Sequence, residues 1–161
     1  MNLHAMLLER EAAGRPVTVG LIGAGKFGTM FLAQARLTRG MHVVAIADLD
    51  VGRALSQLRT AGWDEAAISA RSLDDALAAG RTHVTADAET LIACPAIEVI
   101  VEATGVPPAG IRHALGAIGH GKHVVMVNVE ADALAGPLLA RKAKAADVVY
   151  SLAWGDQPAL I

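Results

Sequence analysis

The sequence predicts a doubly wound α/β fold, in which helices cover both faces of a parallel β-sheet. Short apolar runs rich in Val and Ile alternate along the chain with Ala-rich segments of helical spacing, as in consecutive β–α–β units. The first apolar run passes into a helix through a glycine-rich turn at residues 23–28. Hydrophobic residues make up 53% of the 161 residues but aromatic residues only 3%, so the core must consist of aliphatic side chains, which suits a parallel sheet.

The first β–α–β unit is predicted near the start of the chain. We expect a short amphipathic helix in residues 1–15, where apolar and charged side chains alternate. Residues 17–22 are an apolar run with the length of a buried parallel strand. Residues 26–38 carry apolar side chains at helical spacing, and Gly40 follows as a stop signal. A second apolar strand is predicted in residues 43–47.

The middle of the chain contains shorter predicted elements. Ser72 precedes one helical segment and belongs to the residue types that favour the N-cap position. The predicted helices are residues 52–60, 64–70, 73–79 and 88–94, and the predicted strands are residues 83–86 and 97–101.

The last third of the chain continues the alternation with longer helices. Residues 107–119 open with two prolines, which helices tolerate in their first turn. Residues 123–127 predict a fifth strand, residues 133–146 a helix and residues 148–153 a sixth strand. Six strands with intervening helices predict the strand order 3-2-1-4-5-6.

Composition limits the domain count and the class of partner. We expect one domain over residues 16–153, with residues 154–161 as the start of a linker or of a second domain. The net charge of −2 and the scattered Lys and Arg argue against nucleic acid as a partner. No apolar run approaches the about 18 residues of a membrane helix, and the N-terminus lacks a signal-peptide pattern, so we expect no membrane partner and a cytoplasmic location. The single Cys94 excludes an internal disulfide and fits a reducing compartment.

The glycine-rich turn has the chemistry that a dinucleotide pyrophosphate requires. Gly23 allows a tight strand-to-helix turn, Gly25 has no Cβ to keep phosphates from the backbone, and Gly28 lets the helix pack close to the strand. The helix that follows directs its free N–H groups and positive dipole end at the phosphates. The alternative is a turn in an α/β protein that binds another ligand. The expected cofactor contacts are Gly23, Ala24, Gly25, Lys26, Phe27 and Gly28.

Two residues after the second strand bear on the choice between NAD and NADP. Asp48 lies 20 residues after Gly28, where a carboxylate can bond the adenosine ribose hydroxyls and repel a 2′-phosphate. Arg53 follows five residues later and could pair with that phosphate instead. The predicted cofactor is therefore NAD or NADP, with Asp48 closer to the expected position.

Two further segments end strands at the edge where ligands bind in open α/β sheets. The segment after the fourth strand follows Glu102 with Ala103, Thr104 and Gly105, whose small side chains would let a nicotinamide riboside lie against the backbone. The alternative is a plain strand-to-helix turn. After the fifth strand, Asn128 could bond the nicotinamide ribose or carboxamide.

Catalytic groups are harder to predict. Glu130 and Asp132 could act as general acid or base. Alternatively, they could cap the start of the following helix, where the helix dipole stabilises negative charge. We favour the helix-capping role for Asp132 and leave Glu130 as the only catalytic candidate. Two carboxylates supply too few ligands, so no metal site is predicted. The histidines His113, His120 and His123 are interpreted as structural or solvated.

The motifs together resemble the nucleotide-binding domain of homoserine-dehydrogenase-like oxidoreductases. More closely, they resemble the branch with a C-terminal SAF-type domain, some of whose members are deoxyxylulose-phosphate-reductoisomerase-like enzymes of isoprenoid precursor synthesis. The resemblance implies an NAD(P)-dependent oxidoreductase acting on a small-molecule substrate, with a homo-oligomer formed through a C-terminal region that this sequence lacks. The matching segments are residues 19–28, 47–50, 101–105, 121–132 and 150–158.

One departure from the family pattern affects the expected activity. Homoserine dehydrogenases and typical reductoisomerases carry Ala-Asn-Lys after the fifth strand, whereas here Val129 follows Asn128. This argues against plain homoserine dehydrogenase activity and favours the reductoisomerase-like branch. The alternative function is a non-catalytic NAD(P)-binding or nucleotide-sensing module. Trp154, Gly155 and Asp156 are expected either to border a substrate site or to begin a linker.

Overall fold

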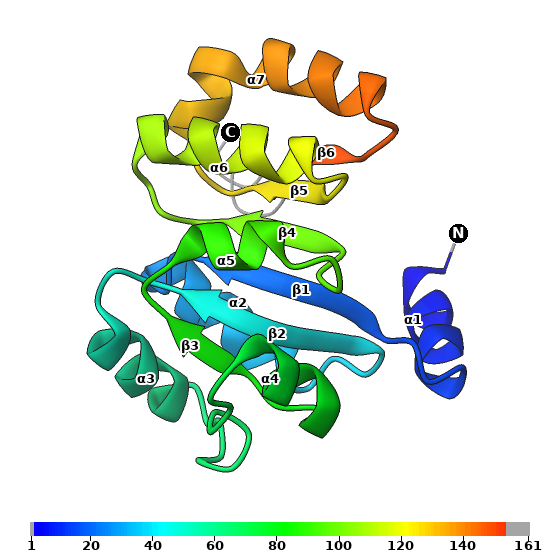
Figure 1. Ribbon diagram of the computed structural model, residues 1–161, viewed down its shortest axis with the longest axis vertical. Helices are drawn as coiled ribbons and strands as arrows, with labels where there is room; N and C mark the ends of the chain where they lie inside the picture. Colours follow the sequence, from blue (N-terminus) through cyan, green and yellow to red (C-terminus); the bar gives the residue numbers. More distant parts are fainter. Residues whose placement is uncertain (1, 154–161) are drawn as a thin grey trace.

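A six-stranded parallel sheet forms the centre of the computed structural model, which describes residues 2–153 (Figure 1). The strand order β3-β2-β1-β4-β5-β6 confirms the predicted doubly wound topology. The direction in which successive strands are added reverses between β1 and β4. Ligands bind at this topological switch point in such sheets. The strands are β1 Val17–Ile22, β2 Met41–Ala47, β3 His83–Thr85, β4 Val99–Glu102, β5 His123–Met126 and β6 Tyr150–Leu152.

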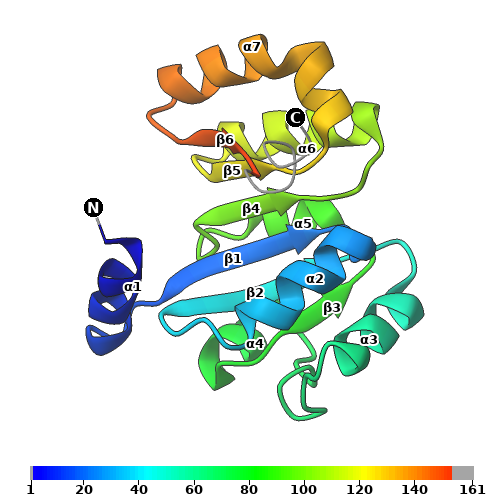
Figure 2. The same cartoon turned by 180° about the vertical axis from the view of Figure 1, so that it is seen from behind.

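Helices pack on both faces of this sheet and divide the core into two clusters. One cluster joins the sheet to α4, α5, α6 and α7, and the other joins it to α2 and α3 on the opposite face (Figure 2). Within the described residues, no helix is long and apolar enough to cross a membrane. The helices are α1 Leu3–Ala12, α2 Lys26–Ala35, α3 Val51–Thr60, α4 Leu73–Ala79, α5 Ala88–Ala93, α6 Pro107–Gly119 and α7 Val129–Ala145.

Side-chain caps define where several helices begin. Ser72 accepts a hydrogen bond from the backbone N–H of Asp75, as predicted, and α4 has the predicted bounds. Asp50 and Asp87 cap α3 and α5 in the same way. Helix α6 also has its predicted bounds and begins with Pro107 in the position that needs no N–H donor.

The prediction of a helix over residues 64–70 is wrong, because this segment forms hydrogen bonds with residues at the edge of the sheet. It forms a turn in which the carbonyl of Ala67 accepts a hydrogen bond from the backbone N–H of Thr82, while Ala70 makes a single parallel bridge to His83. Ile68 is buried in the core. Hydrogen bonds to a neighbouring segment thus outweigh local helix propensity.

Helices α7 and α2 each differ from the prediction by several residues at one end. Helix α7 begins at Val129, four residues earlier than expected, because the Asn128 side chain accepts from the backbone N–H of Ala131 and starts the helix there. Helix α2 ends at Ala35 instead of residue 38, since the next residues form a tighter turn in which the Thr38 N–H donates to the Ala35 carbonyl.

The N-terminal helix α1 lies at the amino end of β1, away from the carboxyl edge of the sheet (Figure 1). It buries none of its residues completely. Arg10 holds it in place through an ion pair of 2.7 Å with Glu98, and the same carboxylate accepts from the backbone N–H of Thr18. This helix therefore supports the sheet without approaching the candidate site.

Candidate functional site

The glycine-rich turn after β1 is shaped by close backbone contacts. Gly23 has a φ of +97°, and a Cβ at this position would lie 2.6 Å from the carbonyl oxygen of Ala103. A Cβ at Gly28 would collide with the carbonyl oxygen of Gly23. Glycine is therefore required at both positions, because any larger residue would push this turn away from the turn after β4 or from its own helix.

Gly25 differs from the other two glycines because its Cβ side is open. No atom lies within 4 Å of the position a Cβ would take there. Gly25 is also the N-cap of the ten-residue helix α2, and no side chain caps that terminus. The open space and the uncapped N–H groups together suit an anion that approaches the backbone closely.

Asp48 follows β2 and faces the glycine-rich turn. Asp48 is 8% exposed, and its carboxylate accepts hydrogen bonds from the backbone N–H of Ala24 at 2.8 Å and of Asp50 at 2.9 Å. Arg53 contacts both oxygens, at 3.0 and 3.3 Å. Burial alone would raise the pKa of Asp48, but the two backbone donors and the Arg53 guanidinium outweigh it and lower the pKa. The carboxylate is therefore charged at neutral pH.

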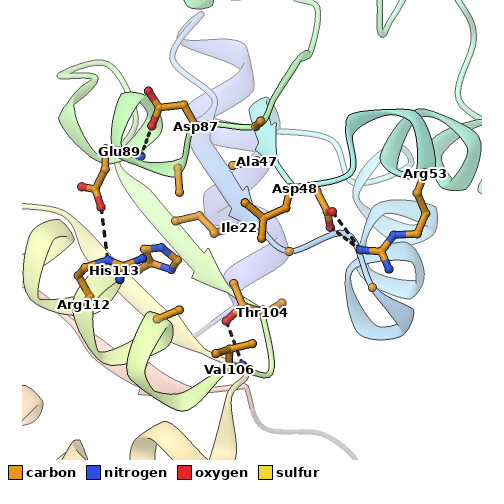
Figure 3. Close-up of a pocket in the computed structure, with 17 residues that line it drawn as sticks. Ile22, Ala47, Asp48, Arg53, Asp87, Glu89, Thr104, Val106, Arg112 and His113 are labelled. Carbon is orange, nitrogen blue, oxygen red and sulfur yellow. Dashed lines mark hydrogen bonds and ion pairs between the residues drawn. The ribbon is translucent and has the colours of Figure 1, made fainter.

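A cavity of roughly 600 Å³ opens between these elements. Figure 3 shows Asp48 and Arg53 on one side of it and Thr104, Arg112 and His113 on the other. The predicted cofactor residues that line the cavity together are Gly23, Gly25, Asp48, Arg53, Ala103 and Thr104. The predicted residues outside its lining are Ala24, Lys26, Phe27, Gly28, Gly105 and Asn128.

The turn after β4 is held against the glycine-rich turn by its backbone. The Ala103 N–H donates to the carbonyl of Ile22 at 2.7 Å, and Gly105 has a φ of +68°. The Thr104 hydroxyl donates to Glu102 at 2.6 Å and accepts from the backbone N–H of Val106 at 3.3 Å. The hydroxyl proton of Thr104 is therefore already used within the protein.

Glu102 and His113 form a buried polar contact that the sequence analysis missed. Glu102 is completely buried, and its Oε1 lies 3.3 Å from Nδ1 of His113, which is 5% exposed. The sequence offered one sign of this contact, an acid at the end of an otherwise apolar strand. Such a residue needs a buried partner, but its position 11 residues from His113 gives no indication which partner it finds.

The polar residues after β5 belong to the start of α7. Asn128 is 2% exposed and caps the helix, so Asn128 is the N-cap in place of the predicted Asp132. Asp132 instead accepts a hydrogen bond of 2.7 Å from the hydroxyl of Tyr150. Burial raises the pKa of Tyr150, and its bond to Asp132 raises it further, so this hydroxyl remains a donor. Glu130 is exposed in the first turn of the helix.

Several predicted features have no outcome in the structure. The cofactor contacts expected from Lys26 and Phe27 remain predictions, and both side chains are exposed at the start of α2. The expectations for Trp154, Gly155 and Asp156 fall outside the described residues.

Comparison with known protein families gives a match over most of this chain. A family model described as "Homoserine dehydrogenase, NAD binding domain" matches residues 19–152, which include every strand of the sheet except the first two residues of β1. A homoserine dehydrogenase of Methylobacillus glycogenes is 33% identical over 116 residues. That match covers 71% of this chain but only 25% of the relative, so the chain spans about a quarter of its length.

Solved structures show the same fold. A homoserine dehydrogenase from Thiobacillus denitrificans superimposes with a TM-score of 0.66 at 24% identity, covering 86% of this chain and 29% of that one. An NAD-binding oxidoreductase from Klebsiella pneumoniae gives a TM-score of 0.60 at 22% identity, covering 86% of this chain and 34% of that one. At these identities the likeness concerns the fold, and this chain spans about a third of each structure or less.

Proposed function

Because this chain belongs to the family of homoserine dehydrogenase NAD-binding domains, we propose that it holds NAD at the carboxyl edge of its sheet as the cofactor domain of an oxidoreductase. The observation that carries the proposal is the juxtaposition of Gly25, open on its Cβ side at an uncapped helix, with the buried carboxylate of Asp48. When bound, NAD supplies the hydride chemistry, and the protein supplies binding and orientation.

In the proposed complex, each half of the dinucleotide would lie on one side of the crevice. The N–H groups at the start of α2 would receive the pyrophosphate beside Gly25. Asp48 would accept from the adenosine ribose hydroxyls. The turn at Ala103 and Thr104 would support the nicotinamide riboside through its backbone, since the Thr104 hydroxyl donates to Glu102.

The same geometry favours NAD over NADP. The guanidinium of Arg53 forms hydrogen bonds with both carboxylate oxygens of Asp48. A 2′-phosphate would have to break this pairing and sit beside a buried negative charge. The alternative assignment to NADP depends on Arg53 and on the family resemblance, and Arg53 already pairs with Asp48. The assignment to the reductoisomerase-like branch depends on the resemblance and on Val129 in place of the family's lysine.

Titration calorimetry with NADH tests the proposal directly. Gly25→Val places a branched side chain where the pyrophosphate must approach, so affinity should fall at least about tenfold. Gly119→Val is the matched control, because Gly119 is exposed and no atom lies within 4 Å of its Cβ position. Equal affinity of the wild type and Gly25→Val would contradict the proposed site.

The reaction of the whole protein is a separate proposal. We expect an NAD-dependent oxidoreductase acting on a small molecule, with Glu130 as the candidate acid or base within this chain and self-association of the complete protein. The second candidate is a non-catalytic NAD-sensing module. It is favoured by the buried position of Asn128 and by Val129 after it, which leave Glu130 as the exposed titratable residue within residues 128–132.

A further inference from the structure

Two buried polar atoms of opposite character lack a hydrogen-bond partner within the described residues. They are Oε2 of Glu102, an acceptor at the end of β4, and Nδ2 of Asn128, a donor just after β5. Glu102 is 0% exposed and Asn128 2% exposed. Buried polar atoms are nearly always paired in native proteins, so each of these atoms calls for a partner.

Gly110 of α6 brings the two atoms to one place. A Cβ at Gly110 would lie 2.8 Å from Nδ2 of Asn128 and 2.9 Å from Oε2 of Glu102. Both atoms therefore lie next to the same point, which is the position that a Cβ of Gly110 would occupy. A small rotation of either side chain, or one bridging water, would satisfy the acceptor with the donor.

The remaining polar atoms of both side chains already organise the turns of the cofactor edge. Oε1 of Glu102 accepts from the hydroxyl of Thr104 at 2.6 Å and from its backbone N–H at 3.3 Å. Oδ1 of Asn128 accepts from the backbone N–H of Ala131 at 3.1 Å. A link between Glu102 and Asn128 would thus join the turn after β4 to the start of α7.

We propose that Glu102 is a positioning residue that pairs with Asn128, directly or through one water, and fixes these two turns under the nicotinamide half of the dinucleotide. The inference rests on the proposed NAD site. It gives the buried acid at the end of β4 a role that its place in the strand does not explain. It also explains Gly110, because any side chain there would separate the pair.

An exchange of the two polar groups tests the pairing. In Glu102→Gln, the amide oxygen keeps the bonds from Thr104, so the amide nitrogen faces the Asn128 donor. Asn128→Asp places two carboxylates together. The double variant restores one donor and one acceptor in swapped positions with nearly unchanged shape. Because Asp and Asn are equally good N-caps, the start of α7 is preserved. NADH and ADP affinities are measured for all four proteins, since ADP occupies only the adenosine half and the phosphate site.

Each single variant should weaken NADH binding about tenfold while ADP binding changes less than about twofold, and the double variant should recover most of the loss. A general loss of structure would weaken both ligands alike. If Asn128→Asp alone does not fold, folding of the double variant is the expected rescue, and a double variant that stays unfolded overturns the inference. Additive losses, with NADH bound by the wild type, overturn this inference alone. Failure of the wild type to bind NADH or ADP overturns the proposed function as well.

Discussion

Asp48 shows how one buried carboxylate can serve both the fold and the site. It accepts backbone hydrogen bonds from Ala24 in the glycine-rich turn and from Asp50 at the start of α3, and it pairs with Arg53. Three segments of the chain therefore meet at this side chain. A ligand hydroxyl would add to an already charged and oriented acceptor, which reduces the cost of binding.

Asp48→Asn should lower the free energy of unfolding at pH 7 by about 1 kcal/mol, because the neutral amide weakens the bonds from Ala24, Asp50 and Arg53. The folded-state pKa of Asp48 lies below its ordinary 3.8, so its contribution is complete above that value and is lost as the pH falls through the lowered pKa. Urea unfolding at a series of pH values should show the difference in stability shrinking as the pH falls below 3.8.

The control for this prediction is Asp64→Asn. Asp64 is exposed, and its carboxylate makes no hydrogen bond within the described residues, so the stability of this variant should follow that of the wild type at every pH. A constant difference between Asp48→Asn and the wild type from neutral to acid pH would show that the charge of Asp48 does not stabilise the fold.

Cofactor choice is also decided at single residues. The wild type should bind NADH more tightly than NADPH, because a 2′-phosphate meets the charge of Asp48. Asp48→Ser should narrow this preference at least about tenfold by leaving Arg53 free to pair with the phosphate. The affinities of the wild type and Asp48→Ser for NADH and NADPH, measured at fixed salt, test this expectation. An NADPH preference in the wild type that disappears in Arg53→Ala would refute the role given to Asp48.

Among the elements, α6 is distinguished by the close packing that Gly110 permits. The helix begins after the turn at residues 103–105 and carries His113 toward Glu102. Gly110 lets it approach the ends of β4 and β5 closely, since a Cβ there would also lie 3.2 Å from the Cβ of Ala131. Close packing of α6 and α7 therefore depends on this one position.

Gly110→Ala should destabilise the protein by about 1–3 kcal/mol, even though Ala is the better helix former by about 1 kcal/mol. The new methyl group meets Asn128 and Glu102 at distances under 3 Å, and both side chains are buried. In thermal unfolding, Gly119→Ala on the same helix should be neutral or stabilising, because its Cβ position is open. A Gly110→Ala variant as stable as Gly119→Ala would show that the Glu102 and Asn128 side chains move aside freely.

At the scale of the whole molecule, the described residues form a sheet with one helix group on each face and a crevice at its carboxyl edge. The chain covers about a quarter of the curated relative that it matches and about a third of the solved structures or less. Substrate sites in two-domain dehydrogenases lie between domains, where closure excludes water from the reacting groups.

We therefore predict that the 161-residue chain binds NADH but does not oxidise it. Oxidation of NADH and NADPH is followed with homoserine-type aldehydes and with deoxyxylulose phosphate, and binding is measured on the same preparation as the control for a competent site. The physical reason is that, of the two acids in the first turn of α7, Asp132 is bonded to Tyr150 and Glu130 is exposed to solvent. Turnover that is lost in Glu130→Gln would reverse this prediction and make Glu130 catalytic.

The sequence by itself determined the fold class, the strand order and the glycine-rich turn with Asp48, because these follow from periodicity and from backbone requirements of neighbouring residues. It misplaced the segment at residues 64–70 and the start of α7, where hydrogen bonds donated by the backbone N–H groups of Thr82 and Ala131 outweigh propensity. Only the tertiary structure decided which buried polar groups meet. Glu102 and Asn128 are brought to one point by Gly110, because packing of separate elements, and not distance along the chain, selects their neighbours.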